Sequence, residues 1–580
     1  MKKRIIYLFA LALALVLCMA IFVGCDEAPE ESGSESGSES AAGGLDNTKF
    51  NMFYNDEYLC AFVQGDNATA DEKAVAKELR VAIAEKTGKQ LAFITESKLT
   101  DEYKYVIVLG NTGLQESKDV YASLGEREAV AKVVGNKLVI AFSSRESGLG
   151  IVESLTNELA NNNEGELRLA LDYNAKYKAL PSLHDLPDYE EGTSEIIDCG
   201  EGTTMLYIPD ATTGYFEEYC QSVEAAEFKK VFTREEQENI FCAFVGETDY
   251  IYAYYLKSYY AARIVTGPIE QFAEPDYSID APETVKPYLA SIPQPNDGQG
   301  YIFQLPDGRF IIQDGGYKGE DRVYKALKQL KPEGEIVIAA WFISHPHSDH
   351  YPAFIDFIKA HGKDKTIVLE RVINNYINDE MYNINGTAGV DNSGAAVKEF
   401  YSAAKQYIPD VPIIKAHTGQ VLTFGSVAIE VLYTPEDMIP APIKNINGTS
   451  FVFRIITGDG QTFMMLADTY VDSANIMIKV WGDYLRSDIM QMAHHAIWPA
   501  NSDLYNCIKA ETILYTAALK NLKNYLFRNS SNAGYVAVNE TALSYAKDIY
   551  LSIDEMYIFE FPHTIKNNKE EMLDYIKNYK

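Results

Sequence analysis

Cysteine is scarce in this chain, with 7 in 580 residues. Cys18 and Cys25 lie near the start, and no two cysteines form a C-x-x-C pair. A set this sparse and odd in number does not provide a disulfide framework. We therefore expect the other cysteines to be buried small hydrophobic residues without a metal role, and they are Cys60, Cys199, Cys220, Cys242 and Cys507.

Positive charge is also in short supply. The chain has 51 Lys and Arg against 83 Asp and Glu, which gives a formal net charge of −32. A surface of this sign repels polyanions and lacks the basic patch that nucleic-acid-binding proteins present. Nucleic acid is therefore not an expected partner.

One long uncharged apolar run lies at the N-terminus, over residues 5–23, behind the basic start Met1-Lys2-Lys3-Arg4. The run ends at Phe22-Val23-Gly24-Cys25, which is typical of a lipoprotein signal peptide and its cleavage site. A retained transmembrane anchor is the alternative. We expect residues 1–24 to be a signal peptide and Cys25 to carry lipid. The rest of the chain would then be extracytoplasmic and anchored to a bacterial cell membrane.

Histidine is rare as well, yet three of the 9 histidines lie within six residues, in His345-Pro346-His347-Ser348-Asp349-His350. The segment directly follows an apolar run over residues 336–343. Imidazole and carboxylate are the ligand types that hold zinc and similar metals. A short strand that ends in such a turn predicts a metal site, and a polar loop with chance histidines is the alternative.

This pattern resembles the metallo-β-lactamase-fold hydrolases. The resemblance extends over about residues 291–565. Residues 301–316 are similar to the opening hairpin of that family, and residues 462–468 and 488–495 are similar to its later ligand-bearing strands. With Asn447-Gly448-Thr449-Ser450, the order is most similar to a secreted subgroup. That subgroup includes the hydrolase domain of the DNA-uptake channel protein and the phosphorylcholine esterase of teichoic acid.

The resemblance implies a site with two divalent metals, zinc in the first place and manganese as an alternative. It implies His345 and His347 on the first metal, Asp349, His350 and His494 on the second, and Asp468 as the bridge. His495 is the rival to His494. The third histidine of the first metal is open, because His417 is either that ligand or a surface residue. Asp349 is also the expected catalytic residue, which orients the water, and Asp314 supports the ligands from behind.

Two departures from the subgroup concern the backbone of this site. Ala467 precedes the bridging acid where the subgroup usually has glycine. Ala496-Ile497 follows the paired histidines where it usually has Gly-Ser. Both changes keep the expected ligands and leave the local backbone shape as the open question.

Composition and pattern predict three folded domains behind an acidic, Gly/Ser-rich tether over residues 25–47. Residues 48–185 form a small α/β accessory domain, with a helix over residues 70–87, and residues 186–290 form a small α+β domain. In the latter we expect helices over residues 214–226 and 234–239. The tyrosine-rich run over residues 250–255 is either a packed strand or a saccharide platform.

The predicted fold is therefore an αββα four-layer metallo-β-lactamase fold over residues 291–580, preceded by two small α/β or α+β domains. The predicted function is a metal-dependent hydrolase on the outer face of the cytoplasmic membrane, which uses a metal-activated hydroxide on an ester or phosphodiester of the cell envelope. The alternatives are a nuclease or cyclic-nucleotide phosphodiesterase, and a non-catalytic wall- or glycan-binding lipoprotein with a degenerate metal site. No protein partner is predicted.

Overall fold

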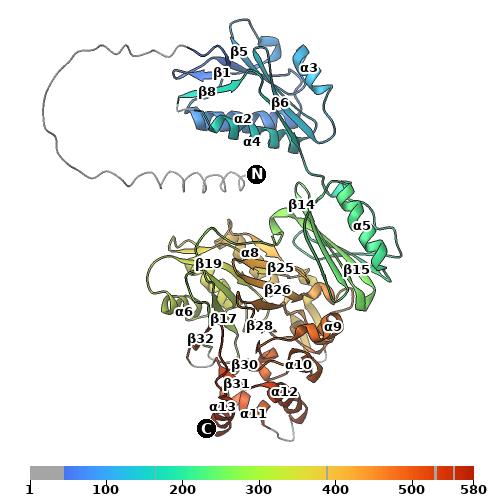
Figure 1. Cartoon of the computed structure of the whole chain (residues 1–580), viewed down its shortest axis with the longest axis vertical. Helices are drawn as coiled ribbons and strands as arrows, with labels where there is room; N and C mark the ends of the chain where they lie inside the picture. The colour runs from blue at the N-terminus through green and yellow to red at the C-terminus, as the bar shows by residue number, and fades with distance from the viewer. Residues whose placement is uncertain are drawn as a thin grey trace, which may run out of the picture. The chain divides into compact units, whose positions relative to one another are not determined.

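The computed structural model describes residues 45–162, 165–294, 296–386, 389–527, 532–552 and 555–579. The predicted signal peptide, Cys25 and the tether up to residue 44 lie outside these residues. Among the helices described, none is both long and apolar enough to cross a membrane. The described residues divide into two compact units, one up to residue 180 and one from residue 181 (Figure 1).

The first unit contains a six-stranded sheet in the order β4-β3-β5-β7-β6-β9. Helices α2 and α4 pack on one face of the sheet, and α3 packs on the other. The predicted helix over residues 70–87 is α2, and Thr69 caps its N-terminus as a capping box. The elements are β1 (Lys49–Tyr54), β2 (Glu57–Tyr58), β3 (Cys60–Gln64), α2 (Ala70–Thr87), β4 (Phe93–Thr95), β5 (Tyr105–Leu109), α3 (Gln115–Tyr121), β6 (Glu128–Val134), β7 (Lys137–Phe142), α4 (Arg145–Ala160), β8 (Glu166–Ala170) and β9 (Asn174–Lys178).

The second unit begins with a six-stranded antiparallel sheet, which we call the β10–β15 module. Its elements are β10 (Glu195–Asp198), β11 (Thr204–Pro209), α5 (Thr213–Ala225), β12 (Lys229–Glu236), β13 (Asn239–Val245), β14 (Asp249–Leu256) and β15 (Ala261–Pro268). The prediction of a helix over residues 234–239 is wrong. Gln237 and Glu238 have φ of 53° and 60°. Two consecutive left-handed residues form a tight hairpin turn, so this segment joins β12 to β13 instead of forming a helix.

The rest of the second unit, which we call the sandwich, contains an eight-stranded and a seven-stranded sheet. The first sheet and its helices comprise β16 (Tyr288–Ser291), β17 (Gly300–Gln304), β18 (Phe310–Asp314), α6 (Arg322–Leu330), β19 (Ile336–Phe342), α7 (Pro352–His361), β20 (Ile367–Leu369), β21 (Val372–Asn374), α8 (Gly394–Tyr407), β24 (Ile413–Lys415) and β32 (Ile558–Glu560). A hairpin of β22 (Asn383–Gly386) and β23 (Gly389–Asn392) stands apart from it.

The second sheet and its helices comprise β25 (Val421–Phe424), β26 (Val427–Tyr433), β27 (Val452–Ile456), β28 (Thr462–Met465), α9 (Val471–Trp481), β29 (Ile489–Gln491), α10 (Ser502–Ile508), β30 (Thr512–Tyr515), α11 (Leu519–Leu526), α12 (Ala533–Tyr545), β31 (Asp548–Leu551) and α13 (Lys569–Asn578). Strand β28 pairs with β29 in parallel, as β18 does with β19 in the first sheet. Each sheet thus has carboxyl ends of parallel strands at one edge.

The layers of the sandwich follow from which core each side chain joins. On β19, Ala340 and Phe342 belong to a buried cluster shared with Phe453 and Met465 of the second sheet. Trp341 of the same strand packs instead against Phe354 and Phe357 of α7. Strand residues therefore alternate between the opposite sheet and the covering helices, as side chains on a pleated strand do. The predicted αββα arrangement is confirmed.

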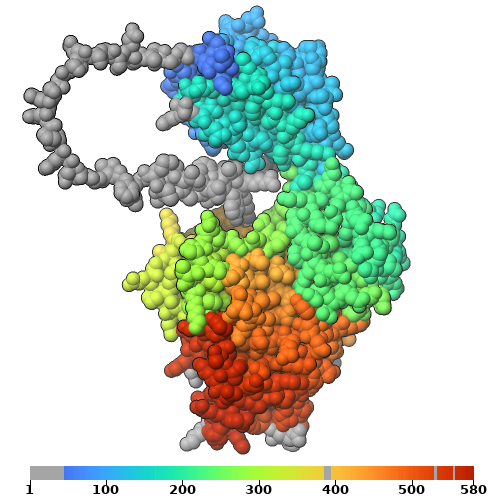
Figure 2. Space-filling model, in the orientation of Figure 1, coloured from blue at the N-terminus to red at the C-terminus, as the bar shows by residue number. Residues whose placement is uncertain are grey.

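The β10–β15 module packs directly on the sandwich (Figure 2). Tyr250, Tyr252 and Tyr254 of β14 are fully buried against it, whereas Ile251 and Tyr255 pack in the cluster beneath α5. The tyrosine-rich run is therefore a packed strand, and these rings are not available as a saccharide platform.

Polar groups are buried in the same interface. The Arg263 guanidinium donates to the Asp437 carbonyl over 3.0 Å, and the Tyr254 hydroxyl donates to the Asp437 carboxylate over 3.1 Å. The Lys415 ammonium donates to the Cys199 carbonyl over 2.7 Å. Charged groups enclosed this way need their partners, since an unpaired buried charge is strongly destabilising. The interface between the β10–β15 module and the sandwich therefore resembles a protein interior, in which buried polar groups are hydrogen-bonded.

Candidate metal centre

The predicted ligand residues follow the ends of strands from both sheets. His345, His347 and the Asp349-His350 pair come shortly after β19, Asp468 comes after β28, and the paired histidines come after β29. Because β19 and β29 each run parallel to a neighbour, these turns lie at the carboxyl edges of their sheets. The sandwich brings the two edges together, so the turns face one another.

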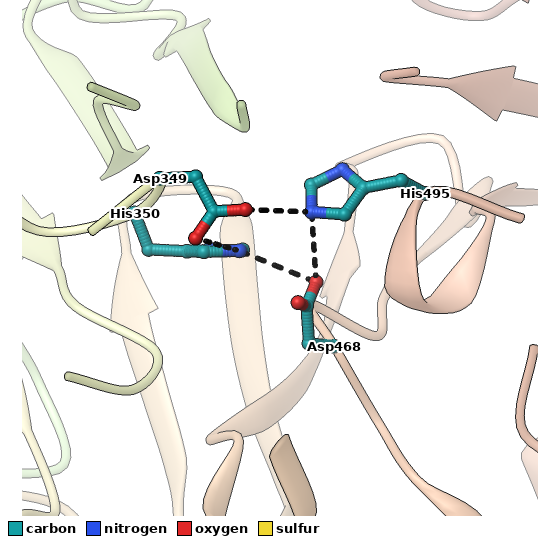
Figure 3. A group of neighbouring side chains, drawn as sticks. All are labelled: Asp349, His350, Asp468 and His495. Carbon is teal, nitrogen blue, oxygen red and sulfur yellow. Dashed lines mark ion pairs between the residues drawn. The ribbon is translucent and has the colours of Figure 1, made fainter. Parts of the chain in front are cut away.

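Four side chains form one group of converging donors: Asp349, His350, Asp468 and His495 (Figure 3). The Asp468 Oδ1 atom lies 3.2 Å from His350 Nε2 and 3.2 Å from His495 Nε2. His495 Nε2 lies 3.4 Å from Asp349 Oδ2. Zinc bonds of about 2.0–2.1 Å place tetrahedral donors about 3.3 Å apart, so these spacings fit one metal ion.

A second group of donors consists of His345, His347 and Asp468. His345 Nε2 is 3.1 Å from His347 Nδ1 and 3.7 Å from Asp468 Oδ2. Asp468 is therefore shared: its Oδ1 atom faces the four-donor group, and its Oδ2 atom faces the three-donor group. Two ions that share one carboxylate are the arrangement of two-metal hydrolytic centres.

Unpartnered buried atoms support the metal assignment. Among the described residues, His350 Nε2, His495 Nε2 and Asp468 Oδ1 are buried and have no hydrogen-bond partner. Buried polar atoms are normally satisfied, because leaving one unpaired costs about 1–3 kcal/mol. Three such atoms that point at one another, all of types that bind zinc, fit a divalent cation between them.

Outer contacts hold the ligand rings in place. The Asp314 carboxylate lies 2.8 Å from His350 Nδ1 and accepts from the Ser344 amide and hydroxyl, over 2.8 Å each. Thr516 Oγ1 lies 2.9 Å from His495 Nδ1. In both rings Nδ1 is engaged and Nε2 faces the centre, which is how metal-binding histidines are oriented in proteins. The Asp314 carboxylate therefore lies behind the His350 ring, at the Nδ1 atom that faces away from Asp468.

Opposite charges shift the ionisation of this centre. Burial disfavours the imidazolium form, but Asp468 and Asp349 raise the pKa of His495 to about 9. The same carboxylates, with Asp314, hold the pKa of His350 well above its ordinary value despite burial. Burial alone dominates at His494 and lowers its pKa to about 4. The carboxylates thus favour positive charge at His350 and His495, which is the charge that a bound cation would supply.

We expect metal binding at about pH 7.5 to release about two protons per chain, because His350 and His495 must deprotonate before they bind a cation. Titration calorimetry in buffers with different ionisation enthalpies measures this number directly. The affinity for zinc should fall as the pH falls, and release of no protons would contradict the expectation.

The same shift predicts a stability profile for the metal-free protein. The pKa of His495 is about 9 in the folded chain, against about 6.5 when unfolded. The folded state thus binds this proton more tightly, so its stabilisation is fully present below pH 6.5 and is lost as the pH rises through about 9. The midpoint of urea unfolding should therefore fall between about pH 7 and pH 9.

Left-handed backbone conformation is concentrated in the turns of this centre. The φ values are 52° at Asp314, 47° at Ala467, 48° at His494, 56° at His495 and 65° at Ala496. A residue with a Cβ atom adopts this region at a cost of about 1–2 kcal/mol. Ala467 and Ala496 are the positions where the sequence has alanine instead of the expected glycine, so the backbone keeps a glycine-like shape there without glycine.

We expect Ala467→Gly to change the free energy of unfolding by less than about 1 kcal/mol. Relief of the left-handed conformation offsets the loss of a buried methyl group and the extra freedom of unfolded glycine. Ala493→Gly is the matched control, because Ala493 is equally buried but lacks a positive φ. That variant should cost about 1–2 kcal/mol. Urea unfolding of the metal-free proteins compares the two, and equal losses would contradict the argument.

Of the two rival histidines, His495 belongs to the four-donor group and His494 does not. The sequence favoured His494 as the first residue past the strand. The structure instead turns His495 inward through the two left-handed residues. His494 lies beside the three-donor group, with its Nε2 atom 3.6 Å from Asp468 Oδ2.

His417 is neither a surface residue nor a member of either donor group. It is fully buried, with Nδ1 2.8 Å from the Glu436 carboxylate and Nε2 3.1 Å from the Tyr250 hydroxyl. Its ring stacks on Tyr252 at a centroid distance of 4.8 Å. Both expectations for His417 are corrected: it joins the sandwich to the β10–β15 module.

Several residues of the centre were not singled out from the sequence. Ser344 and Thr516 contact ligand histidines, and the Gln491 amide bonds the Ala467 carbonyl over 3.1 Å. Asn447 lies 3.2 Å from His494 Nε2. Of these four residues, only Asn447 lies in a motif that the sequence pointed to, Asn-Gly-Thr-Ser. The other three are ordinary polar residues near strand ends, and no sequence pattern distinguishes them.

No protein-family model matches the chain, and the comparison with curated proteins finds no match. Among solved structures, the chain is similar to the metallo-β-lactamase-fold protein YhfI from Bacillus subtilis. The identity is 17%, the alignment covers 47% of this chain and 99% of that one, and the TM-score is 0.29. It is also similar to CmlA, a diiron β-hydroxylase from Streptomyces venezuelae, at 11% identity, 48% and 55% coverage, and a TM-score of 0.28.

A metallo-β-lactamase from Cronobacter sakazakii aligns at 14% identity over 33% of this chain and 62% of that one, with a TM-score of 0.21. The chain thus spans little more than half the length of the last two proteins. TM-scores this low support no conclusion about activity. The assignment of the site depends on the layers and the donor geometry of the chain itself.

Proposed function

We propose that this protein is a metal-dependent hydrolase with a two-metal centre. The observation that carries the proposal is Asp468, whose two oxygens each face a separate group of buried imidazole and carboxylate donors. Two divalent ions bound there would lower the pKa of a coordinated water and polarise the substrate. No serine or cysteine nucleophile is then required.

The protein's own residues divide the remaining work. His345, His350 and Asp468 are almost fully buried and fix the geometry. Asp349 is the most accessible member of the four-donor group, with 20% of its side chain accessible, so it can orient a water. His350 and His495 lower the pKa of Asp349 in spite of burial, which keeps this carboxylate ionised.

The substrate that we propose is an ester or phosphodiester of the cell envelope. The main charges acting on Asp349, Asp468 and His494 are those of neighbouring histidines and carboxylates, and no Lys or Arg is among them within the described residues. With a net charge of −32, such a site favours a small substrate over a polyanion. This counts against the nuclease alternative. An extracytoplasmic location, with lipid on Cys25, remains part of the proposal and is supported by the N-terminal sequence.

The test is the metal content of the purified protein together with hydrolysis of bis(p-nitrophenyl) phosphate and p-nitrophenyl phosphorylcholine. We expect two metals per chain and turnover that is lost in His347→Ala. Two metals without turnover of either ester would refute the substrate class and keep the centre. No metal and no turnover after addition of zinc or manganese would refute the enzyme and favour a binding lipoprotein.

A further inference from the structure

Among the described residues, the three-donor group lacks a fourth protein donor. His345, His347 and Asp468 supply three donors, whereas the other group has four. Catalytic zinc sites commonly keep three protein ligands and leave a fourth position for water or substrate. The side chains next to this open position are therefore candidates to contact the substrate.

Two residues, Asn447 and Trp498, contact His494, which lies beside the three-donor group. The Asn447 Nδ2 atom lies 3.2 Å from His494 Nε2, which is itself 3.6 Å from Asp468 Oδ2. The Trp498 ring meets the His494 ring edge to face, at a centroid distance of 5.2 Å. Asn447 and Trp498 thus contact the same imidazole, which lies beside the three-donor group.

The Asn447 side chain is not needed to hold its own turn. The Asn445 carboxamide oxygen accepts from the Asn447 backbone amide over 2.9 Å, and the Ser450 amide donates to the Asn447 carbonyl over 3.1 Å. The Tyr433 hydroxyl donates to the Gly448 carbonyl over 2.7 Å. These contacts fix the turn through the backbone and leave the Asn447 amide group directed at the centre.

The Asn447 amide is also incompletely satisfied. The residue is 7% exposed, and its Oδ1 atom is buried without a hydrogen-bond partner among the described residues. The unpaired oxygen is an acceptor, so the fold leaves part of this amide's hydrogen-bonding capacity to a water or a ligand. If His494 turns Nε2 toward a metal, the Asn447 NH2 group also becomes free to donate to another acceptor.

Trp498 has the opposite character. It is 48% exposed, although its ring is large and apolar. The ring contacts His494, so its exposed part is available to an apolar or planar part of a substrate bound beside that imidazole. A half-exposed tryptophan beside a polar centre commonly serves as such an anchor.

We propose that Asn447 and Trp498 form the substrate-binding wall beside the three-donor group. Asn447 donates a hydrogen bond to the ester or phosphoryl oxygen, and Trp498 packs against the leaving group. The favoured substrates are therefore small esters or phosphodiesters whose leaving group is planar or apolar. This inference depends on the proposed hydrolase function and assigns its substrate contacts.

The first variant is Asn447→Ala in the full-length protein. Removing one donor to a developing oxyanion typically lowers kcat about 10²–10³-fold, and we expect a loss of this size on bis(p-nitrophenyl) phosphate. Metal content should stay equal to that of the wild type. Asn475→Ala, at an exposed asparagine on α9, is the matched control and should keep full activity.

A readout without turnover is binding of inorganic phosphate to the metal-loaded protein, measured by calorimetry. Asn447→Ala should weaken this binding at least about 10-fold, because the donated hydrogen bond is lost. Loss of a metal in this variant would show that Asn447 is a ligand and overturn its role as a donor. Unchanged phosphate binding and turnover would overturn the inference altogether.

The second variant is Trp498→Ala, with Tyr575→Ala as the control at an exposed tyrosine of α13. We expect KM for the nitrophenyl esters to rise about 10-fold while kcat changes little, because the ring contacts the leaving group in both the bound and the transition state. An unchanged KM would overturn the role of Trp498. If the wild type binds no metal, the proposed function itself fails, which is a result distinct from these.

Discussion

Asp468→Asn is expected to empty both donor groups and to abolish turnover. Each Asp468 oxygen lies within 3.2–3.7 Å of donor atoms in a different group. Asparagine offers one neutral oxygen, and its NH2 group turns positive hydrogens toward a cation. The loss should exceed the about 10–100-fold decrease in metal affinity or activity that follows removal of an outer-contact residue. Elemental analysis of the dialysed variant measures the effect.

The control for this variant is Asp472→Asn, four positions along the chain in the first turn of α9. It makes the same chemical change near the centre without touching either donor group, and its metal content should equal that of the wild type. Retention of one tightly bound metal in Asp468→Asn would show that one group stands without the shared carboxylate. That outcome would contradict the bridging role.

The sequence predicts one half of this centre well for a physical reason. His345 to His350 are contiguous and follow a buried strand, so local pattern alone places them at a strand end. Asp314 and Asp468 were also found at strand ends. A position at the end of a strand depends on local secondary structure, and the pattern of hydrophobic residues predicts that structure directly.

The local sequence pattern could not predict which of His494 and His495 points into the metal centre. An extended strand continued by one residue points His494 inward, since side chains alternate. The chain instead enters the left-handed region at both histidines, with φ of 48° and 56°. This conformation is rare for residues with a Cβ atom, so nothing in the sequence signals it. The neighbouring backbone of the folded site imposes it.

His417 shows a second limit. Its segment has the pattern of a turn between strands, which are usually at the surface. Its burial comes from Tyr250 and Tyr252, more than 160 positions earlier in the chain. A contact over this sequence distance leaves no local pattern, so the sequence predicted the strand of tyrosines but not what it covers.

Contacts between residues far apart in the sequence also explain why the boundaries of the compact units differ from the predicted domains. Composition suggested a separate small domain over residues 186–290, yet the structure groups it with the sandwich in one compact unit. The Arg234 guanidinium of β12 donates to the Gly419 carbonyl over 3.0 Å and pairs with the buried Glu430. Phe241 stacks on Trp481 of α9 at 5.8 Å. The sandwich alone would expose these apolar rings and lose the Arg234 contacts, although Arg454 would still pair with Glu430.

A chain that begins at residue 291 is therefore expected to be insoluble or unfolded, whereas a chain of residues 181–580 should fold. Removal of the β10–β15 module takes away the Arg263 bond to the Asp437 carbonyl and the Tyr250 contact of His417. It also exposes the apolar surface that Phe241 covers on Trp481, and burial of one large side chain contributes about 1.5–3 kcal/mol. Several such losses exceed the about 5–15 kcal/mol that stabilise a typical domain. Yield of soluble protein and cooperative thermal unfolding distinguish the two chains.

A point variant separates loss of the interface from loss of chain length. Arg263→Met in residues 181–580 keeps a long side chain but removes the hydrogen bond to the Asp437 carbonyl and the nearby positive charge that favours the ionised Asp437 carboxylate. We expect a loss of about 3–5 kcal/mol on urea unfolding. Lys318→Met, at an exposed lysine of the same unit, is the control and should change stability by less than about 0.5 kcal/mol. If the chain from residue 291 folds and binds two metals, the module is an independent domain and this account of the interface is wrong.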